Sequence, residues 1–175
     1  MKEPLHKELD AFDDKLTNSI KDTNSGKHFQ TDISIVTVAD LSNITKRSGW
    51  HFDWKYEFKQ PGREVYKLTI LNDPTVIQGL MSIQKKSDHL FIPIIENASF
   101  NKGNRKLYSG IPGTLVAFAC QLSNQRGHEG NVAFISKPQL INHYAQTLGA
   151  LHAGGRVMVI ETQAALKLID TYFKN

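Results

Sequence analysis

The stretch with the clearest chemical character is a polar, basic loop that joins an apolar segment to an amphipathic one. Residues 90–95 are apolar and are followed by Glu96, after which the loop runs to residue 112. The cationic side chains of this loop are Lys102, Arg105 and Lys106. Its last residues, Gly110-Ile111-Pro112-Gly113, lead directly into the amphipathic segment.

A loop of this kind suits an anionic ligand if a helix begins at its end. Residues 113–125 are predicted to be helical, because their apolar side chains recur at steps of three and four. Backbone N–H groups at a helix start have no partner inside the helix, and the helix dipole favours negative charge there. Glycine also lets a phosphate approach the backbone closely. The pattern therefore suits a diphosphate ligand, but these residues alone favour an ordinary helix-entry turn.

The chain before this loop predicts one helix and then a β-rich region. Residues 2–20 have apolar side chains at helical spacing, and the polar residues 21–30 end that helix. A short helix is expected at 40–47. Strands are expected at 33–38, 52–59, 64–71, 76–84 and 89–96.

Two features predict how these strands pair. The turn signal Pro61-Gly62 predicts a hairpin between strands 52–59 and 64–71. The strand 89–96 is apolar on both faces, which is typical of the centre of a covered sheet. Pro93 lies inside that strand and cannot donate a ladder hydrogen bond, so we expect a bulge or a splayed strand there.

The last third of the chain alternates strands and helices. Strands are expected at 132–136 and 157–160, and helices at 138–148 and 164–172, the last capped by Thr162. The order predicts an α/β (α+β) fold with a mixed central sheet, an antiparallel meander and flanking helices. The later strands are expected to run parallel through helical crossovers. We expect one domain over 31–175, preceded by a helix and polar linker over 1–30.

The composition excludes several classes of protein. The chain has 175 residues and a net charge of +4, and this mild surplus without a dense basic stripe does not indicate nucleic-acid binding. The single cysteine, Cys120, cannot form an internal disulfide or a Cys-rich zinc site, and it is expected to be a buried core thiol. The charged first residues do not form a signal peptide, and no apolar run is long enough to span a bilayer. We expect a cytoplasmic protein that needs no metal and no membrane.

From residue 89 onward the sequence resembles the GCN5-related N-acetyltransferase superfamily, and bacterial members look most similar. In that family a strand splays open, and a turn of the form (Gln/Arg)-x-x-Gly-x-(Gly/Ala) then holds the coenzyme A diphosphate. The matching segment is Leu107-Tyr108-Ser109-Gly110-Ile111-Pro112, followed by Gly113. A second match is Asn142-His143-Tyr144 with Thr147-Leu148-Gly149-Ala150. Leu107, Pro112, His143 and Ala150 depart from the family pattern, and Pro112 removes one N–H donor.

The resemblance implies an acyl-CoA N-acyltransferase fold that moves an acetyl group from acetyl-CoA to an amine. It implies that Tyr144 protonates the leaving thiolate and that Glu96 accepts the amine proton, directly or through water. Tyr144 packing in an apolar stripe and Glu96 as a solvated strand end are the alternatives. The coenzyme residues that it implies are Ile95, Asn97, Ala98, Arg105, Lys106, Ser109, Gly110, Ile111, Gly113, Thr114 and Lys137.

Other functions stay open at this stage. The departures at Leu107 and Pro112 favour a module that binds acetyl-CoA without transferring the acetyl group. A weaker alternative is a nucleic-acid-binding protein, which rests on the net charge and on the cations of residues 102–106. The sequence does not identify the amine acceptor, although Asp53 and Glu57 could attract a cationic one. It also leaves open whether two copies form a homodimer.

Overall fold

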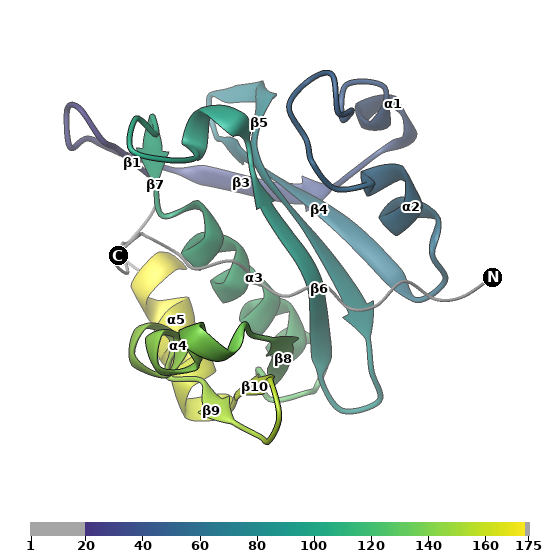
Figure 1. Ribbon diagram of the computed structural model, residues 1–175, viewed down its shortest axis with the longest axis vertical. Helices are drawn as coiled ribbons and strands as arrows, with labels where there is room; N and C mark the ends of the chain where they lie inside the picture. The colour runs from purple at the N-terminus through teal and green to yellow at the C-terminus, as the bar shows by residue number, and fades with distance from the viewer. Residues whose placement is uncertain (1–19, 174–175) are drawn as a thin grey trace.

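The computed structural model describes residues 20–173, which form a mixed sheet covered by helices on both faces (Figure 1). The main sheet has seven strands in the order β3-β4-β5-β6-β8-β10-β9, and only β6 and β8 are parallel neighbours. Its strands are β3 (Thr31–Ile35), β4 (Arg63–Ile70), β5 (Asp73–Lys85), β6 (Leu90–Asn97), β8 (Val132–Ile135), β9 (Leu151–His152) and β10 (Val157–Ile160).

Two apolar clusters fill the space on either side of the sheet. On one face α1 (Val38–Leu41) and α2 (Trp54–Lys59) pack over Val65, Leu80 and Ile94. On the other face α3 (Ile111–Gln125) and α5 (Thr162–Phe173) lie side by side over the sheet, and α4 (Ile141–Leu148) joins the same cluster (Figure 1). Because side chains alternate along a strand, neighbouring residues such as Leu80 and Met81 face different clusters.

The prediction of a strand at 52–59 is wrong, because this segment forms helix α2. Asp53 caps the helix by accepting a hydrogen bond from the Tyr56 N–H at 3.0 Å. The expected hairpin with 64–71 is therefore also wrong, and β4 pairs instead with β5. The short helix expected at 40–47 is largely wrong, because α1 ends at Leu41. The helix begins earlier, at Val38, where Thr37 and Asp40 form a capping box.

The expected polar linker 21–30 forms two short strands instead. β1 (Ile20–Asp22) pairs with β2 (His28–Phe29) and also with β7 (Tyr108–Ser109), in a three-stranded sheet. The helix expected over 2–20 lies outside the described residues except for Ile20, which is buried at the start of β1. The basic loop before α3 is thus held by a segment from the beginning of the described chain.

The predicted elements of the last third are confirmed, but the direction of one strand is not. β8, α4, β10 and α5 lie where the sequence places them, with the 3-10 turn η2 (Pro138–Leu140) before α4. β10 runs antiparallel to β8, so the parallel arrangement expected there is wrong. The bulge expected at Pro93 is confirmed, since Ser82 pairs with Ile94 but Gln84 pairs with Phe91. None of the helices within residues 20–173 has the length and apolar character of a membrane span.

Candidate functional site

The central feature of the site is the place where the two parallel strands separate. β6 and β8 pair only at Leu90 with Val132 and at Phe91 with Ala133. Beyond these two pairs β6 continues to Asn97 along β5, while β8 continues along β10. The bulge at Pro93 lies directly after the last pair and turns β6 away from β8. A gap between neighbouring strands therefore opens in the middle of the sheet.

The register of β6 indicates which backbone groups face this gap. The Ala98 N–H donates to the Gln78 carbonyl on the β5 side, at 3.0 Å. Because N–H direction alternates along a strand, the N–H groups of Ile95 and Asn97 point away from β5 and toward the gap. The side-chain Oδ1 of Asn97 is also buried and has no hydrogen-bond partner among the described residues. Two donors and one acceptor thus lie at this edge of β6, and such groups match the amides of pantetheine.

The turn before α3 lies close to this end of β6. Asn97 pairs with Gly79 on β5, and Gly79 leaves room for Ile111, whose Cγ2 would be 2.5 Å from a Cβ at that position. Gly110 adopts a left-handed conformation with φ of 90° as the N-cap of α3, which favours glycine. Its carbonyl accepts from the Thr114 hydroxyl at 2.6 Å. The structure therefore brings the predicted turn residues and the end of β6 together.

The turn is covered more fully than the sequence predicts. Residues 110–114 are all buried. Lys21 on β1 pairs with Ser109, and the Thr23 hydroxyl donates to the Lys106 carbonyl at 2.6 Å. On the α5 side, the Tyr172 hydroxyl occupies the space where Gly113 would carry a Cβ. Gly113 therefore makes room for a protein side chain, in addition to any ligand.

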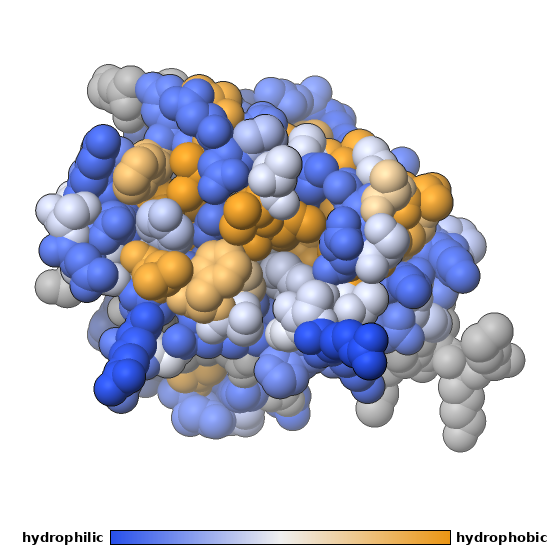
Figure 2. Space-filling view, turned by 90° about the horizontal axis from the view of Figure 1, so that it is seen from above, coloured by the Kyte–Doolittle hydropathy of each residue, from blue (hydrophilic) through white to orange (hydrophobic). Residues whose placement is uncertain are grey.

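The cations of the loop have different roles. Lys102 forms an ion pair with Glu96, with its Nζ 3.0 Å from Oε2. Arg105 is exposed and Lys106 is partly exposed. Figure 2 shows this end of the molecule, seen from the top of Figure 1, where polar side chains surround apolar ones. Arg105 and Lys106 are the loop cations that lie outside the ion pair with Glu96.

Glu96 is buried and its carboxylate accepts four hydrogen bonds. Oε2 accepts from the His51 N–H at 2.7 Å and from Lys102. Oε1 accepts from the Trp54 indole N–H at 2.8 Å and from the Phe52 N–H at 3.2 Å. Burial by itself would raise the pKa of Glu96, but these donors outweigh it and lower the pKa below its ordinary value of 4.5.

Sequence reasoning placed Glu96 correctly at a strand end but missed its partners. Three of the four donors come from residues 51–54, which precede it by more than forty positions, and the fourth is Lys102. A carboxylate whose pKa is lowered, and whose oxygens already accept hydrogen bonds, is a weak proton acceptor. Its geometry fits a group that holds the start of α2 against the end of β6.

Tyr144 lies on the other face of the sheet from Glu96. It is fully buried in the cluster that contains α3 and α5. Its ring packs edge-on against Phe134, the first β8 residue beyond the last pair with β6, with centroids 5.1 Å apart. Its neighbour His143 has a buried Nε2 without a hydrogen-bond partner among residues 20–173. Lys137 lies at the N-cap of η2 and is partly exposed.

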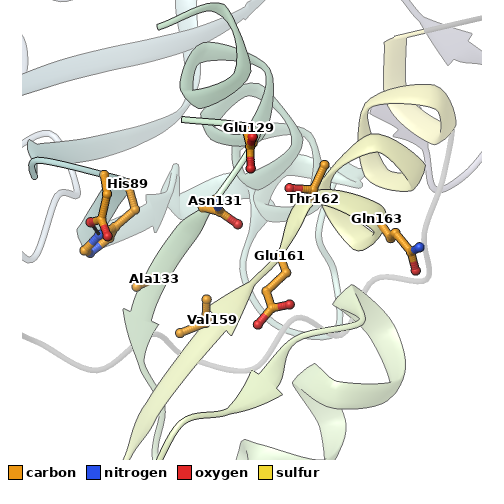
Figure 3. A pocket seen from close by; sticks show the side chains of 9 residues that line it. His89, Glu129, Asn131, Ala133, Val159, Glu161, Thr162 and Gln163 are labelled. Atoms are coloured by element: carbon orange, nitrogen blue, oxygen red, sulfur yellow. Dashed lines mark hydrogen bonds and ion pairs between the residues drawn. The ribbon is translucent and has the colours of Figure 1, made fainter. Parts of the chain in front are cut away.

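A separate cavity of about 660 Å³ lies beside the start of β6 and β8 and the end of β10. Its lining carries three carboxylates, and Figure 3 shows those of Glu129 and Glu161 at separate places around the opening. None of the predicted coenzyme residues lines it. The lining residues are Asp88, His89, Glu129, Asn131, Ala133, Val159, Glu161, Thr162 and Gln163. Negative charge of this kind does not suit phosphate groups. Within the described chain, no group of three His, Cys, Asp or Glu side chains could hold a metal ion.

Comparison with solved structures shows an acyl-CoA N-acyltransferase fold, the fold of the GCN5-related N-acetyltransferase superfamily, as predicted. The ribosomal-protein-S18-alanine N-acetyltransferase of Escherichia coli is similar with a TM-score of 0.53 and 14% identity, over 75% of this chain and 95% of that one. A chimera of the spermidine N-acetyltransferase SpeG from Vibrio cholerae and hSSAT is also similar, with a TM-score of 0.56 and 14% identity. The match covers 78% of this chain and 99% of the chimera.

A third similar structure contains the coenzyme. It is a point variant of the AtaT toxin, bound to the C-terminus of the antitoxin AtaR and to acetyl-CoA. Its TM-score is 0.55 and its identity 15%, over 79% of this chain and 97% of that one. No family model matches the sequence, and no curated protein matches it. The comparisons therefore show a similarity of fold alone.

Proposed function

We propose that the protein transfers an acetyl group from acetyl-CoA to a primary amine in a ternary complex. The observation that carries this proposal is the gap between β6 and β8, in a chain whose fold is similar to that of solved N-acetyltransferases. In this proposal the two substrates meet at the gap from the two faces of the sheet. A thioester lying in it can be reached by an amine from the face opposite the coenzyme.

The chain supplies groups for each part of the coenzyme. The N–H groups of Ile95 and Asn97 hold the pantetheine amides or the thioester carbonyl, next to Ala98, and Asn97 Oδ1 accepts from an amide N–H. The diphosphate lies at the start of α3, near the backbone of Ser109, Gly110, Ile111, Gly113 and Thr114. The cationic side chains assigned to the phosphates are Arg105, Lys106 and Lys137.

The reaction then needs little further chemistry from the protein. The amine nitrogen attacks the thioester carbon, the C–S bond breaks, and the amine loses one proton. Tyr144 donates a proton to the departing thiolate. Because the Glu96 carboxylate is already engaged, we assign it the positioning of residues 51–54, and the amine proton leaves through water. Most of the acceleration comes from holding the two substrates together.

The first experiment measures the melting temperature of the protein with and without acetyl-CoA. At a concentration one hundred times the Kd, a ligand adds about 2.7 kcal/mol to the free energy of unfolding, which corresponds to about 5–11 °C for a chain of this size. Absence of any shift at millimolar acetyl-CoA contradicts the proposal.

The second experiment tests transfer. Tyr144→Phe should keep the thermal shift with acetyl-CoA but slow the release of free thiol in the presence of an amine. Tyr66→Phe is a matched control, because Tyr66 is also buried but lies on β4, against Phe118 in the middle of α3. Equal turnover in the Tyr144 variant and the wild type removes the acid role.

One observation favours a second candidate, a module that binds acetyl-CoA without transferring the acetyl group. The turn residues 110–114 are buried, and Pro112 offers no N–H donor. The same two experiments separate the candidates. A thermal shift without thiol release with any of a panel of amines, including polyamines and peptide N-termini, favours the module.

A further inference from the structure

The C-terminal helix α5 runs alongside α3 in the opposite direction. At its beginning, Ala165 approaches Gly130, which follows the C-terminal end of α3, and a Cβ on Gly130 would be 2.8 Å from that of Ala165. At its end, Tyr172 approaches Gly113 in the first turn of α3. The last residues of α5 therefore lie beside the turn assigned to the diphosphate (Figure 1).

The contact between Tyr172 and residue 113 requires glycine at position 113. A Cβ placed on Gly113 would overlap the Tyr172 hydroxyl and lie 2.6 Å from Cζ of the same ring. Tyr172 is only 5% exposed, so its ring has little freedom to move aside. The phenol hydroxyl thus lies directly against the backbone of the third residue of α3.

The same turn is held from the opposite side by the sheet. Ile111 packs into the space left by Gly79 on β5, as Tyr172 packs into the space left by Gly113. The missing side chains of Gly79 and Gly113 therefore let Ile111 and Tyr172 hold the first turn of α3 in place. The N-cap residue Gly110 has no side chain that could cap the helix. The position of this turn is therefore set by tertiary packing.

We propose that Tyr172 is a positioning residue for the coenzyme diphosphate, so that α5 is part of the coenzyme site. This inference rests on the proposed function. Pro112 leaves few N–H donors in the first turn, and a phosphate held by few donors depends strongly on where each one lies. A shift of the turn toward the space vacated by the hydroxyl would misplace the N–H groups of Ile111 and Gly113.

The test compares acetyl-CoA with S-acetylpantetheine, which has the same thioester arm but no diphosphate. Tyr172→Phe should weaken acetyl-CoA binding about five- to tenfold, equivalent to about 1.0–1.4 kcal/mol, and leave S-acetylpantetheine binding unchanged. Isothermal calorimetry measures both dissociation constants. Where turnover is measurable, KM for acetyl-CoA should rise while kcat stays close to the wild-type value. Tyr66→Phe, the same change on β4, should leave both ligands unaffected.

Gly113→Ala provides a second variant, since its Cβ cannot coexist with the Tyr172 hydroxyl. It should weaken acetyl-CoA binding at least as much as Tyr172→Phe while the far-ultraviolet spectrum stays that of the wild type. Unchanged acetyl-CoA binding in Tyr172→Phe overturns the inference, and so does an equal loss for both ligands, which is a general structural effect. If the wild type binds neither ligand, the proposed function fails first and the inference fails with it.

Discussion

Replacing Glu96 with glutamine tests whether this carboxylate holds the structure together or takes part in proton transfer. Its two oxygens accept from the His51 and Phe52 N–H groups, the Trp54 indole and the Lys102 ammonium group. Glutamine has nearly the same shape, but one of its two polar atoms is an NH₂ group. Whichever way the amide turns, two of the four donors then face another donor.

The least costly arrangement places the NH₂ group at the Oε2 position. Lys102 is 34% exposed and can turn to water, so the His51 N–H is the donor left without an acceptor. An unsatisfied buried N–H costs about 1–3 kcal/mol, and the loss of the ion pair and of charge on the remaining bonds adds about 1 kcal/mol. The free energy of unfolding should therefore fall by about 3 kcal/mol, equivalent to about 6–12 °C in melting temperature.

Urea unfolding followed by tryptophan fluorescence measures this loss, because Trp54 is buried and hydrogen-bonded to Glu96. Glu161→Gln is the matched control, since Glu161 is exposed, and its effect should stay within about 0.5 kcal/mol. A Glu96→Gln variant with wild-type stability would refute the structural reasoning. If that stable variant also lost acetyl transfer, Glu96 would be a proton acceptor after all.

Three further predictions concern other residues. Burial raises the pKa of Cys120 to about 12, so a thiol reagent at pH 8 should modify it only in denaturant; rapid modification of the native protein would contradict its buried position. Gly79→Ala should lower the free energy of unfolding by about 1–3 kcal/mol, because its Cβ would press on Ile111, and a melting curve at wild-type temperature would exclude that contact. Since the folded-state pKa of Glu96 lies below its ordinary value, unfolding takes up a proton, and stability should fall as the pH drops below about 5. Urea titrations at pH 3.5–7 measure this loss, which should be smaller in Glu96→Gln.

The error at α2 shows the limit of reading periodicity in a short segment. Phe52, Trp54, Tyr56 and Phe58 alternate with polar residues, which is the pattern of a half-buried strand. The structure has a helix there because Asp53 caps it and because Trp54 and Glu57 are buried on one of its faces. In six residues the strand and helix patterns overlap, and the capping aspartate was the signal that could have distinguished them.

Contacts between distant segments could not be predicted from the sequence either. The gap-forming bulge was predictable, since Pro93 cannot complete a ladder. The pairing of Lys21 with Ser109 and the contact of Tyr172 with Gly113 were not, because each joins segments about 60–90 positions apart and neither has a local signal. The glycines of the turn therefore indicate a ligand or an ordinary helix entry, and nothing local indicates that Gly113 also accommodates a side chain of α5.

The single parallel junction of the sheet also affects the order in which the chain can fold. The meander from β4 to β6 joins consecutive strands through short turns, so its pairings need only modest loop closure. The pairing of Leu90 with Val132 must first close the long connection that contains α3. Only two residue pairs between β6 and β8 offset the entropy lost in that closure. We therefore expect the meander to form early and the β8–β10 half to dock late, with the first turn of α3 completed only after α5 has arrived.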